Sequence, residues 1–224
     1  MLRIVEPEWL DSLPAADPSA VRSRRELRFV NRLMGNAGAV ARSLSLAEGA
    51  RIVDLGSGDA TFIARVAAKL GARRVQLSLV DRECPPAPEA LARLRALGWE
   101  VRHVAADALE WLAQCSDRLD AITVNLFLHH LHPPALRELL RLAAARTQLF
   151  VACEPRRSAL ALAASRALVL LGVGAVTRHD SVASVKAGFT GRELSAEWPP
   201  SAQWTLDERA SGPFAHLFVA RRKP

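Results

Sequence analysis

Cysteine is scarce in this chain: Cys84, Cys115 and Cys153 are the only three among 224 residues. No two of them have the C-x-x-C spacing of a zinc site or a thiol–disulfide motif. Three widely separated thiols also cannot form the disulfide framework of a small secreted domain. The scarcity therefore excludes a cysteine-based metal site and a disulfide scaffold, and it predicts a protein of the reducing cytoplasm.

Long apolar runs are missing as well. The longest one, residues 158–176, contains Arg166 near its centre. A membrane-spanning helix needs about 20 mostly apolar residues, and an arginine at its centre costs about 2.5 to 3.5 kcal/mol. The first residues, MLRIVEPEWLDSLP, include acidic residues and proline where a secretory signal would be apolar. The sequence thus predicts a buried helix rather than a membrane span, and no secretory signal.

Aromatic residues make up only 5% of the chain, and tyrosine is absent. Lysine is also rare, so arginine supplies most of the positive charge behind the formal net charge of +7. Surfaces that bind single-stranded nucleic acid combine basic and aromatic side chains, and the arginines here have no such aromatic neighbours. We therefore expect no stable nucleic-acid complex. The local arginine cluster consists of Arg22, Arg24, Arg25, Arg28 and Arg32.

The chain does contain a regular alternation of apolar runs and helical patterns. With 50% hydrophobic and 24% charged residues it has enough apolar surface for one core. The runs typical of strands are residues 52–56, 74–81, 100–105, 119–125 and 148–153. The segments typical of helices are residues 20–34, 38–45, 60–70, 87–97, 108–115, 133–145 and 158–171. Strands that alternate with helices predict βαβ units and a parallel sheet.

The end of the chain breaks this alternation. Residues 202–206 and 216–222 are typical of two closing strands joined by a turn at residues 211–213. Such a pair predicts an antiparallel edge on an otherwise parallel sheet. The predicted fold class is therefore α/β: a Rossmann-like, seven-stranded, mostly parallel sheet with an antiparallel edge strand. We expect an N-terminal helical cap over residues 1–48 and a core over residues 49–224.

Polar residues follow the strands of the predicted sheet where each strand ends. In an open α/β sheet the ligand lies outside these carboxyl ends. The polar residues expected there are Asp54, Ser57 and Asp59 after the first strand, Asp81 after the second, Asp107 after the third, Asn125, His129 and His130 after the fourth, and Glu154 after the fifth. The sequence therefore predicts a binding site along one edge of the sheet.

The glycine turn after the first strand indicates what kind of ligand binds. Gly56 and Gly58 allow a tight turn and a close backbone approach. A dinucleotide fingerprint needs a third glycine where Thr61 stands, and Asp59 would repel a phosphate. Asp81 follows Gly58 at the spacing of a carboxylate that binds ribose hydroxyls. These features predict a nucleoside that carries positive charge and no phosphate, which fits S-adenosylmethionine.

Two carboxylates near this edge have alternative roles. Asp107 suits hydrogen bonding to an adenine amino group, and it suits equally well the cap of the short helix that follows. Glu154 is either an ion-pair partner of Arg156 or a substrate contact. Arg24 or Arg28 would meet a cofactor carboxylate if the N-terminal helix folds over the site.

Residues 51–154 resemble the core of a class I S-adenosylmethionine-dependent methyltransferase. VDLGSGDATF resembles the first motif of that family, Asp81 the acidic second motif, AADALEW the third-strand motif and LDAITVNLFLHHL the fourth-strand motif. Ala60 departs from the family where many members carry a further glycine. The cofactor-binding residues implied by the motifs and the strand ends are Asp54, Gly56, Ser57, Gly58, Asp59, Asp81, Arg82, Asp107, Ala108, Asn125 and Leu126.

The flanking segments carry a second resemblance. RSRRELRFVNRLMGN and RHDSVASVKAGFTGRELS are similar to small bacterial methyltransferases associated with type III polyketide synthases. This implies a small aromatic acceptor with a phenolic or quinol-type hydroxyl, and hence O-methylation in secondary metabolism. An acyl tail on the acceptor would lie against the helix over residues 158–171, for which ordinary core packing is the alternative.

Methyl transfer to a phenol needs a group that takes its proton. His129 and His130 follow the fourth strand beside the expected methyl group, an imidazole suits this role, and of the two we prefer His129. The alternative is that one ring packs in the core while the other caps the next helix. His179 beside Asp180 is a second candidate. We see no pair of aspartates at the strand ends that would complete an oxygen-rich shell, and we therefore expect no metal.

Three other functions remain as alternatives. A nicotinamide-dependent oxidoreductase would share the sheet, but Thr61 and Asp107 count against it. An RNA or other nucleic-acid methyltransferase is disfavoured for base methylation because N-L-F-L stands where such enzymes carry an aromatic-rich tetrapeptide. A non-enzymatic protein that binds S-adenosylmethionine would show the same motifs.

Overall fold

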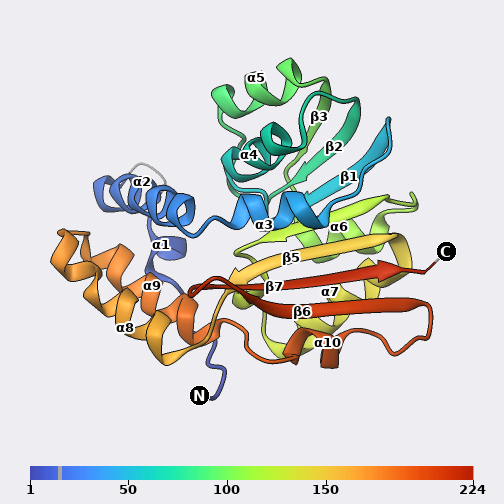
Figure 1. The fold of residues 1–224 in the computed structure, drawn as a ribbon. Helices are drawn as coiled ribbons and strands as arrows, with labels where there is room; N and C mark the ends of the chain where they lie inside the picture. The colour runs from blue at the N-terminus through green and yellow to red at the C-terminus, as the bar shows by residue number, and fades with distance from the viewer. Residues whose placement is uncertain (15–16, 224) are drawn as a thin grey trace.

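The computed structural model describes residues 1–14 and 17–223, apart from the side chains of residues 30–33, among them Arg32. Its sheet has seven strands in the order β3-β2-β1-β4-β5-β7-β6 (Figure 1). The strands are β1 (Ala50–Leu55), β2 (Val75–Val80), β3 (Trp99–Val104), β4 (Ala121–Asn125), β5 (Leu149–Pro155), β6 (Trp204–Ser211) and β7 (Ala215–Arg222).

The first five strands run parallel, whereas β7 pairs antiparallel with both β5 and β6. The chain returns through a helix between consecutive parallel strands, which is why these pairs are parallel. The last two strands are joined by the short turn around Gly212 and form a hairpin. The predicted mostly parallel α/β sheet with an antiparallel edge is confirmed.

Helices cover both faces of this sheet, and the remaining helices form a layer beyond its carboxyl edge (Figure 1). The α-helices are α1 (Trp9–Ser12), α2 (Pro18–Leu33), α3 (Asn36–Ser43), α4 (Thr61–Leu70), α5 (Pro88–Ala96), α6 (Ala108–Gln114), α7 (Pro133–Arg146), α8 (Ala159–Ala167), α9 (Ala175–Ala187) and α10 (Glu193–Glu197). Two 3-10 helices complete the list, η1 (Leu128–His130) and η2 (Leu168–Leu171).

Two hydrophobic clusters hold these layers together. On one face, residues of α3, α4 and α5 pack with the sheet, among them Val40, Ile63 and Leu94. On the other face, residues of α6, α7 and α10 pack around Phe150 and Phe218. All seven positions of β5 are buried, as expected for a central strand covered on both faces.

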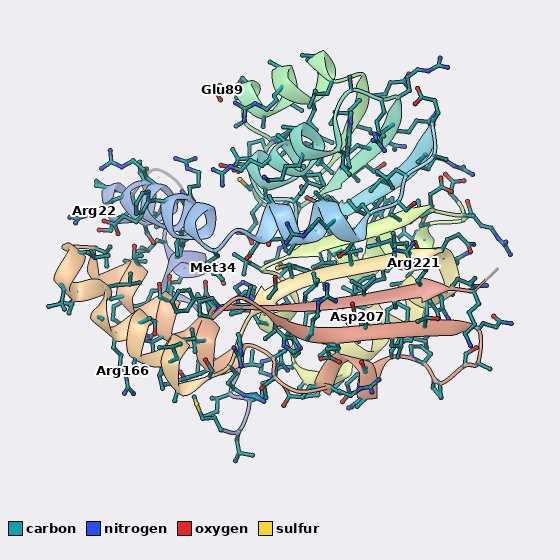
Figure 2. All side chains as sticks on the ribbon, viewed as in Figure 1. Arg22, Met34, Glu89, Arg166, Asp207 and Arg221 are labelled. Atoms are coloured by element: carbon teal, nitrogen blue, oxygen red, sulfur yellow. The ribbon has the colours of Figure 1, made fainter. Side chains whose placement is uncertain are left out.

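The layer beyond the carboxyl edge combines segments from both ends of the chain. Helices α1 and α2 contact α9, which also contacts α8 and η1. Helix α3 instead contacts α4, β5 and β7 and belongs to the sheet layers. Met34 directly follows α2, and Arg22 and Arg166 project from α2 and α8 (Figure 2). No helix in the described part of the chain is long and apolar enough to cross a membrane.

One prediction about this layer is wrong. The apolar run at residues 158–176 was expected to form a buried helix, yet Leu160 of α8 is 61% exposed and Leu170 of η2 is 83% exposed. Helix α9 was not anticipated at all. Its buried side chains include Thr177 and Asp180, so its inner face is partly polar and no apolar stripe marks it in the sequence.

Gly188 sets how closely α9 approaches the end of β5. A Cβ atom at Gly188 would lie 2.3 Å from the carbonyl oxygen of Pro155, and neither backbone can retreat easily because Phe189 N donates to the same oxygen. We expect Gly188→Ala to lower the free energy of unfolding by about 1 to 3 kcal/mol, measured by urea denaturation followed by circular dichroism.

Gly38 offers the matched control. It lies within α3, where a Cβ would meet the flexible ends of two side chains, Arg42 at 3.3 Å and Lys69 at 3.8 Å. Gly38→Ala should be neutral or stabilise the protein by up to about 1 kcal/mol, because alanine favours helix. Equal unfolding free energies for the two variants would contradict the tight approach at Gly188.

Candidate active site

The carboxyl ends of β1, β2, β4 and β5 meet at one edge of the sheet, as the sequence predicted. The turn after β1 has positive φ at Gly56, Gly58 and Ala60. A Cβ atom at Gly56 would lie 2.5 Å from the ring of Phe127, so only glycine fits there. Ala60 adopts the left-handed conformation at the position where a glycine would be usual.

Asp81 fixes this turn to the end of β2. Its Oδ2 accepts a hydrogen bond of 2.8 Å from Gly58 N, and its Oδ1 accepts from the backbone N–H groups of Glu83 and Cys84. The carboxylate is partly exposed. Each oxygen can accept further hydrogen bonds, so the predicted contact with ribose hydroxyls is compatible with these bonds.

Asp54 lies buried beneath the turn with 2% of its surface exposed. Thr123 of β4 donates a hydrogen bond of 2.6 Å to its Oδ1. Burial raises the pKa of Asp54 to about 7, the nearby Asp81 adds to the rise, and the bond from Thr123 opposes it. The structure thus places Asp54 under the predicted ligand site rather than on its open surface.

Asp59 connects the turn to the N-terminal layer. Its Oδ1 accepts from the N–H and the hydroxyl of Thr61, and its Oδ2 lies 3.0 Å from Nη1 of Arg28. Burial alone would raise the pKa of Asp59, but the hydrogen bonds from Thr61 and Arg28 lower it overall. Helix α2 therefore folds over the glycine turn, as the sequence allowed, and Arg28 contacts the turn through Asp59.

The remaining residues predicted at strands β2 and β3 occupy less central positions. Asp107 caps α6 by accepting from the N–H groups of Leu109 and Glu110, so the capping alternative is confirmed. Ala108 is buried at the start of that helix. Arg82 is exposed and pairs with Glu83 at 2.8 Å.

Two buried polar atoms near the turn have no hydrogen-bond partner among the described residues. They are Oγ of Ser57 and Oδ1 of Asn36. The amide of Asn36 donates a 3.1 Å hydrogen bond to Oδ1 of Asn125 at the end of β4. Leu126 follows with a positive φ of 54°. Because unpaired buried polar atoms cost free energy, a polar ligand at this turn would be stabilised by binding Ser57 and Asn36.

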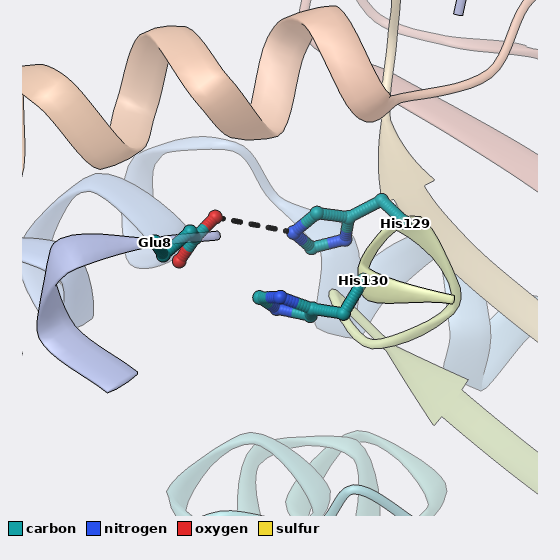
Figure 3. A group of neighbouring side chains, drawn as sticks. All are labelled: Glu8, His129 and His130. Atoms are coloured by element: carbon teal, nitrogen blue, oxygen red, sulfur yellow. Dashed lines mark ion pairs between the residues drawn. The ribbon is translucent and has the colours of Figure 1, made fainter. Parts of the chain in front are cut away.

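His129 is almost completely buried between two carboxylates. Its Nδ1 lies 2.8 Å from Oε2 of Glu154, and its Nε2 lies 3.6 Å from Oε1 of Glu8 (Figure 3). Glu154 has no exposed surface and also accepts from the backbone N–H groups of Phe127 and Leu128. Burial alone would lower the pKa of His129, but the two carboxylates raise it to about 9. His129 is therefore an imidazolium at neutral pH.

His130 has the opposite electrostatic state. Its ring centroid lies 4.1 Å from that of His129, with 35° between the ring planes. Burial and the positive charge on His129 lower its pKa to about 4. The side chain keeps 31% of its surface exposed, and Oδ2 of Asp11 lies 3.9 Å from its Nδ1. His130 is thus neutral at physiological pH and accessible.

Both histidines line a cavity of about 1060 Å³. Most of its wall comes from α2, α8, η2 and α9, and none of the turn residues from Gly56 to Asp59 contributes. Leu126 and Met34 lie where the cavity adjoins the end of β4 and the end of α2. Apolar side chains of η2, exposed at its rim, line it too. The cavity is thus a second compartment beside the glycine turn.

Sequence reasoning missed two residues of this site. Glu8 precedes α1 in a segment without any recognisable motif, so no sequence signal marks it. Asn36 lies at the start of α3, far from the strand ends along the chain. For Glu154 the predicted ion pair with Arg156 is not among the contacts of the described residues, and Glu154 binds His129 instead; its alternative role as a substrate contact stays a prediction. His179 contacts Asp180 at 2.9 Å but stacks on Trp9 and does not line the large cavity.

Among the described residues, one group combines three side chains able to ligate a metal ion. Glu8, His129 and His130 have ligand atoms within 4.8 Å of one another. A metal ion would have to displace the proton that His129 holds between Glu8 and Glu154. Glu8, His129 and Glu154 therefore form an ion-pair cluster. The absence of a metal stays a prediction.

The comparisons with known proteins agree with this geometry. Residues 52–148, less than half of the chain, match the model of a family described as a methyltransferase domain. The match includes the glycine turn, Asp81 and both histidines. No curated protein matches the chain.

Solved structures of similar fold include methyltransferases. The plantazolicin methyltransferase BpumL in complex with SAH has a TM-score of 0.65 and 11% identity, covering 93% of this chain and 92% of that one. The mitomycin 7-O-methyltransferase MmcR has a TM-score of 0.59 and 18% identity, covering 96% of this chain and 60% of that one. A third structure is the 1,6-didemethyltoxoflavin-N1-methyltransferase of Burkholderia thailandensis, solved with bound 1,6-didemethyltoxoflavin and S-adenosylhomocysteine. It has a TM-score of 0.53 and 18% identity, covering 99% of this chain and 94% of that one.

These likenesses establish the Rossmann-like methyltransferase fold. They agree with the methyl donor predicted from the sequence, S-adenosylmethionine. These structures include an O-methyltransferase and an N-methyltransferase, so the fold alone does not select the acceptor atom.

The raised pKa of His129 makes stability depend on pH. The folded-state pKa of about 9 exceeds the ordinary histidine pKa of 6.5, so this stabilisation is complete below pH 6.5 and is lost as the pH rises through 9. It amounts to about 3 kcal/mol. We expect the free energy of unfolding to fall between pH 6.5 and 9, measured by urea denaturation at a series of pH values.

His129→Gln should abolish that fall, because glutamine does not titrate, while lowering stability at pH 6.5. His103→Gln, at an exposed position of β3, is the control and should keep the wild-type slope. A wild-type slope in His129→Gln would contradict the ion-pair cluster.

Proposed function

We propose that this chain transfers a methyl group from S-adenosylmethionine to a hydroxyl of a small aromatic molecule, of the phenolic or quinol type. The observation that carries the proposal is the pairing of two compartments. One is a glycine turn with carboxylates and orphaned polar atoms, and the other is a large apolar cavity whose wall includes a neutral histidine. They adjoin at Leu126, so an acceptor in the cavity would lie beside a donor on the turn.

The residues around the turn fit the donor. Asp81 offers acceptor oxygens for the two ribose hydroxyls, and the outer oxygen of Asp107 is free of its capping bonds for the adenine amino group. Ser57 and Asn36 supply buried polar atoms that need a partner. Bound there, S-adenosylmethionine supplies the methyl group on a sulfonium centre. The turn carries Thr61 where a pyrophosphate-binding turn has its third glycine, and Asp59 would repel a phosphate.

The cavity fits an apolar, planar acceptor. Its wall is dominated by apolar side chains, mostly aliphatic, and includes the aromatic rings of Phe29 and Phe214. Pockets of this kind bind small molecules, and a few polar groups fix their orientation. A nucleic acid would instead need a basic groove with stacking aromatic side chains, which the cavity does not provide. The exposed apolar rim at Leu170 and Leu171 would accommodate an acyl tail on the acceptor.

His130 is the better placed of the two histidines to take the proton. When the acceptor oxygen takes the methyl group, its O–H proton must leave, and a neutral imidazole on the cavity wall can accept it. His129 cannot accept a proton at neutral pH because it already carries two. We therefore propose His130 as the base and His129 as the residue that orients it.

Binding of S-adenosylhomocysteine, the product that the methyl donor leaves, tests the role proposed for the glycine turn and Asp81. We expect S-adenosylhomocysteine to bind the wild-type protein with a micromolar dissociation constant by isothermal titration calorimetry, and NAD not to bind. Asp81→Ala should weaken this binding at least about tenfold, because two hydrogen bonds to the ribose are lost. Asp117→Ala, at an exposed site before β4, should bind like wild type.

Binding of NAD in place of the nucleoside would overturn the methyltransferase proposal in favour of an oxidoreductase. Binding of the nucleoside that survives Asp81→Ala would overturn the role given to Asp81.

The rate of methyl transfer tests the role proposed for His130 as the base. With a panel of phenols and quinols as acceptors, we expect His130→Gln to lower kcat by about 10²- to 10⁴-fold while the affinity for S-adenosylhomocysteine stays unchanged. His132→Gln, at the exposed N-terminal boundary of α7, is the matched control and should turn over like wild type. Wild-type turnover in His130→Gln would show that another group takes the proton.

A further inference from the structure

The first residues of the chain form a strap across the histidine turn. Residues 3–11 are called the N-terminal strap here. At its beginning, Arg3 donates hydrogen bonds to the carbonyl oxygens of Leu128, His129 and Leu131, at 3.3, 3.2 and 2.9 Å. Its guanidinium also lies 4.7 Å from the ring centroid of Phe189. The strap is therefore bonded directly to the backbone that carries both histidines.

A buried carboxylate anchors the other end of the strap. Asp180 of α9 has no exposed surface, and its two oxygens accept hydrogen bonds from Trp9 N at 2.8 Å and Leu10 N at 3.0 Å. The indole of Trp9 stacks on His179 with ring centroids 4.0 Å apart. These two attachments leave little freedom to the residues between them.

Glu8 lies between the two anchors and points at His129. Its Oε1 is 3.6 Å from Nε2 of His129 and also accepts a hydrogen bond from the hydroxyl of Ser184. Glu154 contacts the opposite nitrogen of the same ring. His129 is thus held at both nitrogens, once by the central strand β5 and once by the strap, and its ring supports that of His130 (Figure 3).

We propose that Glu8 is a positioning residue for methyl transfer, which clamps His129 against Glu154 and thereby aims the neutral ring of His130 into the acceptor cavity. This inference rests on the proposed function. It assigns a role in the reaction to a segment that neither the family match at residues 52–148 nor any strand-end motif includes.

The charges around the clamp explain why a carboxylate is needed at this position. The groups that face the two histidines are Glu8 and Asp11 from the N-terminal segment, Glu154 from β5 and Asp180 from α9. With Glu8 and Glu154 at its two nitrogens, His129 keeps its proton. A positive His129 in turn disfavours protonation of His130, which stays available as a proton acceptor.

The test uses Glu8→Gln, which keeps the size of the side chain and its bond to Ser184 but removes the charge. Glu6→Gln is the matched control, since Glu6 belongs to the same strap and pairs only loosely with Lys186, at 3.4 Å. For both full-length variants we would measure the melting temperature, the affinity for S-adenosylhomocysteine, kcat and KM with a phenolic acceptor, and the titration of His129 by ¹⁵N NMR of the imidazole.

In Glu8→Gln we expect the titration midpoint of His129 to fall by about 1 to 3 pH units and kcat to fall by about 10- to 100-fold. The affinity for S-adenosylhomocysteine should stay within twofold of wild type, because the strap does not touch the glycine turn. Glu6→Gln should match wild type in every measurement. If Glu8→Gln lowered both the melting temperature and the affinity for S-adenosylhomocysteine, the variant would have lost folding in general. That outcome would contradict the positioning role proposed for Glu8.

Two failures are distinguishable. A wild-type protein that binds S-adenosylhomocysteine but methylates no acceptor of the panel would overturn the proposed function. An active wild-type protein whose Glu8→Gln variant keeps the same kcat and the same His129 titration would overturn the role of Glu8 alone.

Discussion

The buried carboxylate of Glu154 organises the part of the structure that carries His129 and His130. It has no exposed surface, yet it is compensated by backbone N–H groups of Phe127 and Leu128 and by the ring of His129. A buried charge is stable only when it is paired and hydrogen-bonded in this way. The pairing fixes the turn after β4 on the end of β5, and the positions of both histidines depend on it.

Two adjacent histidines acquire different protonation states from this one constraint. The carboxylates on either side raise the pKa of His129 to about 9, whereas burial and the neighbouring imidazolium lower that of His130 to about 4. Pairs of titratable groups whose pKa values are driven apart are typical of acid–base sites. The division of roles therefore follows from environment, since the two side chains are chemically identical.

The two compartments of the site are closed by the same outer layer. Helix α2 reaches the glycine turn through Arg28 and Asp59, while α8, η2 and α9 enclose the cavity. The carboxyl edge of the sheet supplies the polar groups, and the outer layer supplies the apolar wall. Because the cavity wall and the glycine turn belong to different layers, the side chains of the wall can differ between proteins of this fold while the glycine turn is kept. This explains how a common fold can serve different acceptors.

The sheet and the polar edge could be predicted because their signals are local. Apolar runs such as that of β1, each followed by a helical pattern, indicate parallel strands, and the glycines of the turn stand directly after a strand. Helix α9 gave no such signal, because its inner face carries two polar side chains. Asp180 is hydrogen-bonded to Trp9, Leu10 and His179, and Thr177 to Ser23 and Glu26, so their burial depends on partners far away in the chain or on the same helix. The exposure of η2 was mispredicted for a related reason: its apolar side chains line a cavity rather than fill a core.

The sequence by itself determined the fold class, the turn at Gly56–Gly58 and the set of strand-end carboxylates, since each depends on residues close together in the chain. Only the tertiary structure decided which groups meet. It brought Glu8 to His129, which is far away along the chain, joined Asn36 to Asn125, and placed His129 rather than Arg156 beside Glu154. Charge states and pKa values depend on such long-range neighbours and on burial, and neither is encoded in local sequence pattern.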